Sequence, residues 1–144
     1  MTETAVLAPV EVDPWRFCRE AQSWDIRAAV SMFPRLAREF TQGALACRVD
    51  GRVDQRGGLS LRLKVDGEVG LTCQRCLGDM AYTVAVERTI HLARNDAEME
   101  RLDALPDSDA IQPGETLSLV ALAEDEVLLS LPYAPMHAAG ACPA

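Results

Sequence analysis

The stretch LSLRLKVDGEV, residues 59–69, decides the fold because apolar and polar side chains alternate along almost its whole length. A period of two places the apolar side chains on one face of a β-strand and the polar ones on the other. Leu61, Leu63 and Val65 are therefore predicted to face the core. Residues 45–53 alternate in the same way, and the intervening QRGG at 55–58 is a hairpin turn signal. The sequence thus predicts two long antiparallel strands.

Elements on both sides of this hairpin complete the predicted fold. Residues 80–93 alternate again and add a third strand to the meander. Asp13 before Pro14 indicates a short helix over about residues 14–22, and residues 31–40 carry a second helical pattern. Residues 117–131 return to helical periodicity, with Thr116 as the expected N-cap. We expect one α+β domain over residues 1–144, an antiparallel meander sheet, open or closed into a barrel, packed by short N-terminal helices and one C-terminal helix.

Charge is unevenly distributed along the chain. Residues 1–94 carry +1 and residues 95–144 carry −9, which together give the net charge of −8. The acidic, polar stretch 95–114 is predicted to be a long mobile loop with a short strand near Ile111. An acidic protein is not a strong nucleic-acid binder by default, so charge alone favours a solvated loop without a partner.

Composition indicates a soluble cytoplasmic protein. No stretch approaches the roughly 20 apolar residues of a membrane span, and the first residues lack the pattern of a secretory signal. An odd number of cysteines, five, fits a reducing compartment better than a disulfide framework. We therefore expect a cytoplasmic protein with no membrane partner, in which Cys18 and Cys47 are small buried side chains.

Cys73 and Cys76 form a C-x-x-C pair at the break between two predicted strands. Two thiolates at this spacing converge on one point, as a metal site or a dithiol switch requires. His137 and Cys142, in the Cys/His-containing tail 133–144, would complete a Cys₃His set for one zinc ion. The residues leave zinc binding and free thiols open. A dithiol oxidoreductase is disfavoured because a strand, rather than a helix, follows the pair.

Two charged groups are candidate binding surfaces. A basic RNA-binding face is predicted opposite the apolar face of the strands, with a further arginine between the cysteines: Arg48, Arg52, Arg62, Lys64 and Arg75. The alternative is an ordinary solvated sheet face. An acidic run inside the last predicted helix is a candidate for binding a partner: Glu124, Asp125 and Glu126. Here too a solvated helix face is the alternative. His91, near the end of the third strand, is expected to be structural.

Motifs of the common enzyme classes are absent from the sequence. There is no G-x-S-x-G, no H-E-x-x-H, no P-loop and no glycine-rich dinucleotide turn. We therefore expect a protein that is not an enzyme and has no small-molecule substrate.

Three motifs occur together in order: LTCQRC at 71–76 followed by the strand at 82–90, LVALAEDEVLLSLP at 119–132, and then His137 and Cys142. In this combination the chain, from about Val10 onward, resembles the YceD-like family, the bacterial large ribosomal RNA subunit accumulation proteins. The resemblance implies a cytoplasmic, non-enzymatic ribosome-biogenesis factor needed for accumulation of large-subunit rRNA through its synthesis, processing or stabilisation. Its partner would be the rRNA precursor or a ribosome-assembly protein. The alternative is a zinc-stabilised adaptor that holds a basic ribosomal or RNA-processing protein through its acidic helix and loop.

Overall fold

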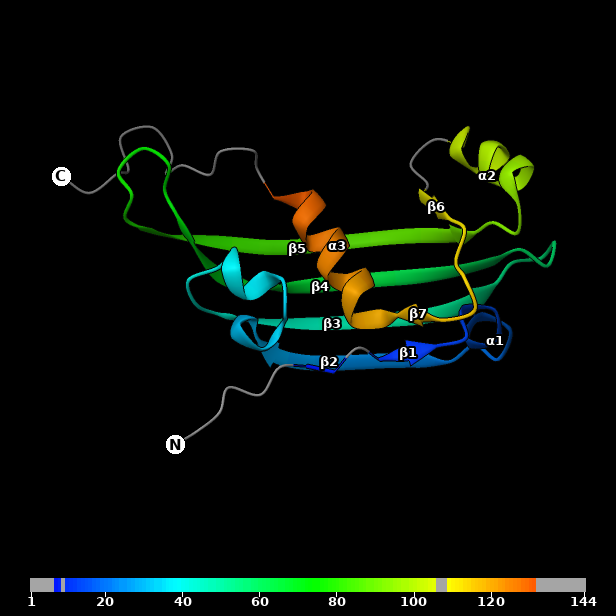
Figure 1. Cartoon of the computed structure of the whole chain (residues 1–144), viewed down its shortest axis with the longest axis horizontal. Coiled ribbons are helices and arrows are strands. Elements are labelled where there is room, and N and C mark those ends of the chain that lie inside the picture. The colour runs from blue at the N-terminus through cyan, green and yellow to red at the C-terminus, as the bar shows by residue number, and fades with distance from the viewer. Residues whose placement is uncertain (1–6, 9, 106–108, 132–144) are drawn as a thin grey trace.

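The computed structural model describes residues 7, 8, 10–105 and 109–131, and it is built around one five-stranded sheet (Figure 1). The sheet order is β2-β3-β4-β5-β6. Its strands are β2 Ser23–Ala29, β3 Ala44–Val53, β4 Leu59–Thr72, β5 Asp79–Leu92 and β6 Asp109–Ile111. The first four are antiparallel, and β6 pairs in parallel with the end of β5. The predicted meander is confirmed, and the sheet is open rather than closed into a barrel.

Most of the other elements lie over one face of the sheet, in front of the strands in Figure 1. They are β1 Glu11–Val12, α1 Pro14–Arg19, the 3₁₀ turns η1 Val30–Met32 and η2 Leu36–Arg38, β7 Leu117–Ser118 and α3 Leu119–Ser130. We call the covered face the inner face and the opposite one the outer face. An antiparallel sheet with one covered face buries every second side chain and leaves the others in water.

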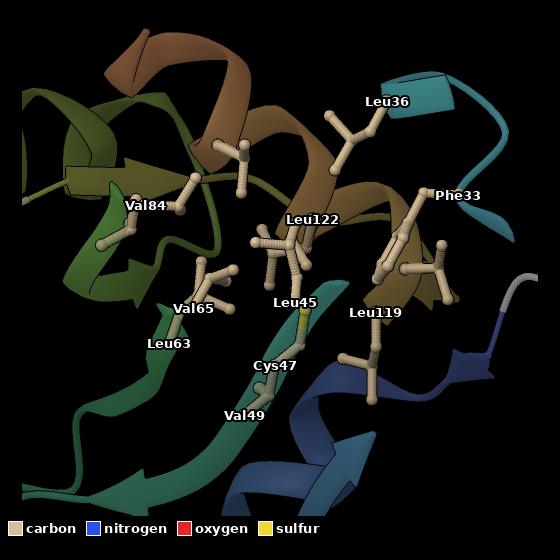
Figure 2. Close-up of a cluster of buried hydrophobic side chains, with 14 of the residues drawn as sticks. Phe33, Leu36, Leu45, Cys47, Val49, Leu63, Val65, Val84, Leu119 and Leu122 are labelled. Atoms are coloured by element: carbon tan, nitrogen blue, oxygen red, sulfur yellow. The ribbon is translucent and has the colours of Figure 1, made fainter. Parts of the chain in front are cut away.

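The core fills the space between the inner face and these elements, as Figure 2 shows. Leu61, Leu63 and Val65 of β4 are fully buried, which confirms their predicted inward orientation. Residues from outside the sheet complete the cluster: Phe33, Leu36, Leu119 and Leu122. Cys18 and Cys47 are buried, as predicted. The period-two pattern therefore correctly predicts which side chains of β4 are buried on the inner face and which lie on the outer face.

Helix α1 begins where the sequence predicts it. The Asp13 carboxylate accepts hydrogen bonds from the backbone N–H groups of Trp15 and Arg16, at 3.0 and 3.3 Å, and Pro14 occupies the first turn. The helix ends at Arg19, short of the predicted end at residue 22. It lies directly on β3 because Gly51 has no side chain there. A Cβ at this position would be 2.4 Å from the Phe17 carbonyl oxygen.

The predicted helix over residues 31–40 is wrong. The segment contains η1 and η2 instead, with Pro34 between them, which has no N–H to donate to a helical ladder. Phe33, Leu36 and Phe40 are nevertheless buried, so short turns satisfy the apolar pattern that suggested a helix. Tertiary packing has overridden the local helical signal here.

Two other differences concern the last third of the chain. Ser118, rather than Thr116, caps α3, because its hydroxyl accepts from the Ala121 N–H at 3.1 Å while Leu117 and Ser118 pair with β1. The predicted loop 95–114 contains helix α2, Asp96–Asp103, capped by the Asn95 side chain. The short strand expected near Ile111 is confirmed as β6. No helix in the described part of the chain is long and apolar enough to span a membrane.

Candidate nucleic-acid interface

The strand register brings the four predicted sheet cations onto the outer face. Arg48 lies opposite Lys64, Arg62 lies opposite Asp50, and Arg52 lies opposite Ser60. Directly opposed residues project from the same side of a sheet. Their sequence neighbours Val49 and Leu63 are buried on the inner face. The sequence therefore predicted correctly that these cations share one face.

The outer face also carries acidic side chains that the sequence pattern does not reveal. Arg48 forms salt bridges with Asp50 at 3.0 Å and with Asp25 at 3.8 Å, and Arg62 pairs with Glu87. Hydrogen bonds from Arg48 and then from Ser23 hold the pKa of Asp50 below its usual value. Three carboxylates thus alternate with the arginines across neighbouring strands. The face is a mosaic of both charges rather than a basic patch.

Arg75 is not brought together with the other cations. It lies in the turn that joins β4 to β5, at the opposite end of the sheet from the β3–β4 hairpin (Figure 1). Thr72, where β4 ends, is ten residues from Arg62, about 33 Å along a strand. One short contact surface therefore cannot include both Arg75 and Arg52.

The cysteine pair forms a tight turn between β4 and β5, as predicted. The Cys73 N–H donates to the Gly78 carbonyl at 2.9 Å, and the Leu77 N–H donates to the Cys73 carbonyl at 2.8 Å. Leu77 has a φ of 59°, an uncommon conformation for leucine that the turn requires. Cys73 is buried and Cys76 is half-buried.

The predicted zinc set is only half inside the described structure. Within residues 7, 8, 10–105 and 109–131, no three His, Cys, Asp or Glu side chains group closely enough to hold a metal ion. His137 and Cys142 lie outside these residues. Two thiols three residues apart on a tight turn are a suitable half of a Cys₃His site. Zinc binding by the four residues stays a prediction.

The acidic run of α3 faces its own chain. Glu124 is 3% exposed, and its carboxylate accepts from the backbone N–H groups of Arg35 and Leu36, at 2.6 and 3.3 Å. It caps the start of η2, so its predicted role as a surface carboxylate that binds a partner is wrong. Asp125 is exposed and pairs with the Arg35 guanidinium at 2.5 Å. Glu126 lies 3.8 Å from Arg88. Its pKa is raised mainly because it is partly buried, and secondly because the carboxylate of Asp109 is nearby. A partner role for Asp125 and Glu126 stays a prediction.

A cationic hollow at the hairpin end of the sheet was not predicted. It has a volume of about 570 Å³, and its polar and aromatic lining includes Trp15, Arg56, His91, Arg94 and Arg101. These residues come from α1, the β3–β4 turn, β5, the segment after it and α2. No sequence window contains them together, and His91 was expected to be structural. In the sequence, the only hint of this hollow is that Arg56 lies in the β3–β4 turn and Arg94 directly follows β5.

Comparison with known proteins identifies the family. The family model for the large ribosomal RNA subunit accumulation protein YceD matches residues 61–144, which include most of β4, all of β5 and α3, and both predicted half-sites for zinc. The chain belongs to this family. The large ribosomal RNA subunit accumulation protein YceD of Haemophilus influenzae is 26% identical over 139 residues, which are 95% of this chain and 80% of that protein. No solved structure matches the chain. The family name indicates a role in accumulation of the large ribosomal subunit RNA.

Proposed function

We propose that this protein is a non-enzymatic, cytoplasmic factor that supports accumulation of large-subunit rRNA by binding the precursor RNA directly. Family membership supports the role in accumulation. The observation that carries direct contact is the outer face, where Arg48, Arg52, Arg62 and Lys64 lie on two adjacent strands away from the layer of helices. Phosphate contacts by such cations position a protein on RNA without reading its sequence.

The salt bridges on the outer face do not prevent such contact. Exposed ion pairs contribute about 0–1 kcal/mol each, so a phosphate can replace a carboxylate at little cost. Arg52 and Lys64 form no salt bridge with any described residue, which makes them the most available cations. Repulsion from the interleaved carboxylates and the net charge of −8 should keep the affinity modest. The binding should therefore be weak, sequence-tolerant and sensitive to salt.

The test compares wild-type protein with the double variant Arg52→Gln/Lys64→Gln in filter binding to a precursor large-subunit rRNA fragment between 50 and 200 mM salt. If two single-stranded phosphate contacts are lost, the slope of log K against log salt should become shallower by about 1.4. Arg38→Gln is the matched control, because Arg38 is an exposed arginine of η2 on the covered side of the sheet. An unchanged slope and affinity in the double variant would contradict contact through this face.

A protein partner is the alternative, and a pull-down alongside the filter-binding experiment would reveal it. If the wild-type chain binds no RNA but retains a basic ribosomal protein in a pull-down, the adaptor hypothesis replaces direct RNA contact. In that case Asp125→Asn should weaken the retention, because Asp125 is the most accessible carboxylate of the acidic run. The same variant should leave RNA binding unaffected if the proposed function is right.

A further inference from the structure

The cationic hollow lies where α1, the β3–β4 turn, the end of β5 with the segment after it, and α2 meet at one end of the sheet. Figure 1 shows α1, the β3–β4 hairpin and α2 gathered at this end, away from the cysteine turn. Its volume of about 570 Å³ falls within the usual range of roughly 300–1,000 Å³ for ligand pockets. Leu59, Leu92 and Leu102 add apolar wall beside the charged groups. The hollow therefore combines an apolar surface with cations, as a base and its phosphate together require.

The cations of this hollow are more available than its carboxylates. Arg56 and Arg94 form no salt bridge with a described residue, whereas Arg101 lies 3.6 Å from Glu98. The Asp54 carboxylate accepts from the N–H groups of Arg56 and Gly58, both at 2.8 Å, and so is occupied by its own turn. These backbone hydrogen bonds also lower the pKa of Asp54. Guanidinium groups suit phosphate oxygens because their planar donors match them in pairs.

Trp15 and Arg94 line this hollow and also a second one beside it. The second hollow is lined further by Asp13, Arg19, Pro113, Gly114 and Glu115, and has a volume of about 820 Å³. An aromatic side chain and a guanidinium therefore stand between two adjoining spaces. Stacking on an aromatic side chain next to a cation is the usual way in which proteins hold single-stranded RNA. Two adjoining spaces suit a continuing chain better than one isolated small molecule.

His91 connects the hollow to the outer face. It lines the hollow, and in the sheet it lies opposite Ser60, which itself lies opposite Arg52. A strand of RNA leaving the hollow past His91 would reach Arg52 without crossing another element. The hollow and the proposed phosphate-binding face are thus parts of one continuous surface.

We propose that the hollow holds one nucleotide of a single-stranded RNA segment, with its base against Trp15 and its phosphate at Arg94 and Arg56. This inference rests on the proposed function, and it adds a site, a strand state and a stacking contact to it. Neighbouring nucleotides would continue into the second hollow on one side and over His91 toward Arg52 on the other.

Tryptophan fluorescence tests the stacking contact, because the chain has only two tryptophans. In Trp24→Phe protein the emission comes from Trp15 alone, and titration with a single-stranded RNA 12-mer should quench it in a saturable way. In Trp15→Phe protein the emission comes from Trp24, which lies on edge strand β2, and it should not change. Trp15→Leu should weaken binding by about 5- to 150-fold, while Trp15→Phe should retain most of it because the ring still stacks.

Salt dependence tests the phosphate contact. Arg94→Gln should weaken binding and make the slope of log K against log salt shallower by about 0.7, and Arg38→Gln should do neither. Normal RNA binding that is reduced by Arg52→Gln/Lys64→Gln, but without Trp15 quenching and with no effect of Arg94→Gln, would overturn the hollow and leave the proposed function standing. Equal binding of duplex RNA, or a full response to uridine monophosphate alone at the same concentration, would also overturn it. Absence of any RNA binding would overturn both proposals.

Discussion

Replacing Glu124 with glutamine should destabilise the protein although the two side chains have nearly the same shape. The Glu124 carboxylate is buried between α3 and η2, where it accepts from two consecutive backbone N–H groups, those of Arg35 and Leu36. The Arg35 Nε also faces it at 3.5 Å. These N–H groups have no helical partners because η2 begins at this point. One buried carboxylate therefore holds α3 against the start of η2, although Glu124 and Arg35 are 89 positions apart in the sequence.

The magnitude follows from these contacts. A hydrogen bond to a charged group contributes about 1.5–3 kcal/mol and a neutral one about 0.5–1.5, so losing the charge costs about 1 kcal/mol per backbone bond. Glu124→Gln should thus lower the free energy of unfolding by about 2 kcal/mol. Glu124→Ala should cost about 4 kcal/mol, because it leaves both N–H groups without an acceptor. The alanine variant removes a large share of a typical stability of about 5–15 kcal/mol, so glutamine is the better probe.

Urea unfolding followed by circular dichroism measures this loss of unfolding free energy. In thermal unfolding, the melting temperature of Glu124→Gln should fall by about 6 °C. Asp125→Asn is the matched control. It removes an exposed carboxylate that pairs with the same Arg35 and should change stability by about 1 kcal/mol or less. If Glu124→Gln unfolds within about 0.5 kcal/mol of the wild type, as surface substitutions do, the capping role of Glu124 is refuted.

Two further predictions concern the cysteines. Burial raises the pKa of Cys47 to about 12 from a usual value of 9.0, so between these values the folded chain binds more protons than the unfolded chain and stability falls as pH rises. Between pH 8 and 10, the free energy of unfolding in urea should fall by about 1.4 kcal/mol more for wild-type protein than for Cys47→Ala. Equal losses in the two proteins would contradict the raised pKa of Cys47. Elemental analysis of protein that includes residues 1–144, purified without chelator, should find about one zinc per chain if Cys73, Cys76, His137 and Cys142 bind it. This zinc should be lost in Cys76→Ser. Metal-free protein with freely titrating thiols would contradict the zinc prediction.

Local sequence patterns were sufficient for strands β3, β4 and β5, but not for strand β2 or for the segments that pack on the sheet. Residues 59–69 alternate because β4 has one buried and one solvated face, and each residue reports its own side. Residues 31–40 also carry a clear apolar pattern, yet they form 3₁₀ turns. Their burial is decided by the sheet beneath them, which no local pattern contains. Helix α2 was missed for a related reason, since its acidic surface resembles that of a loop although Asn95 supplies a cap.

The candidate sites differ in the same way. The shared outer face of Arg48, Arg52, Arg62 and Lys64 follows from period-two alternation and was predictable. The carboxylates between them depend on strand register, because Asp25 and Glu87 reach these arginines only across β2 and β5. The order of the motifs also identified the family, which the comparisons confirm.

By itself, the sequence determined strands β3, β4 and β5, the inward set of Leu61, Leu63 and Val65, the first cap at Asp13 and the cysteine turn, whereas it left β2 unassigned. All of these depend on neighbours within a few residues. Only the tertiary structure decided that Glu124 closes onto Arg35 and Leu36, and that Trp15, Arg56 and Arg94 line one hollow. These arrangements join residues tens of positions apart, so they exist only once the core has brought the segments together.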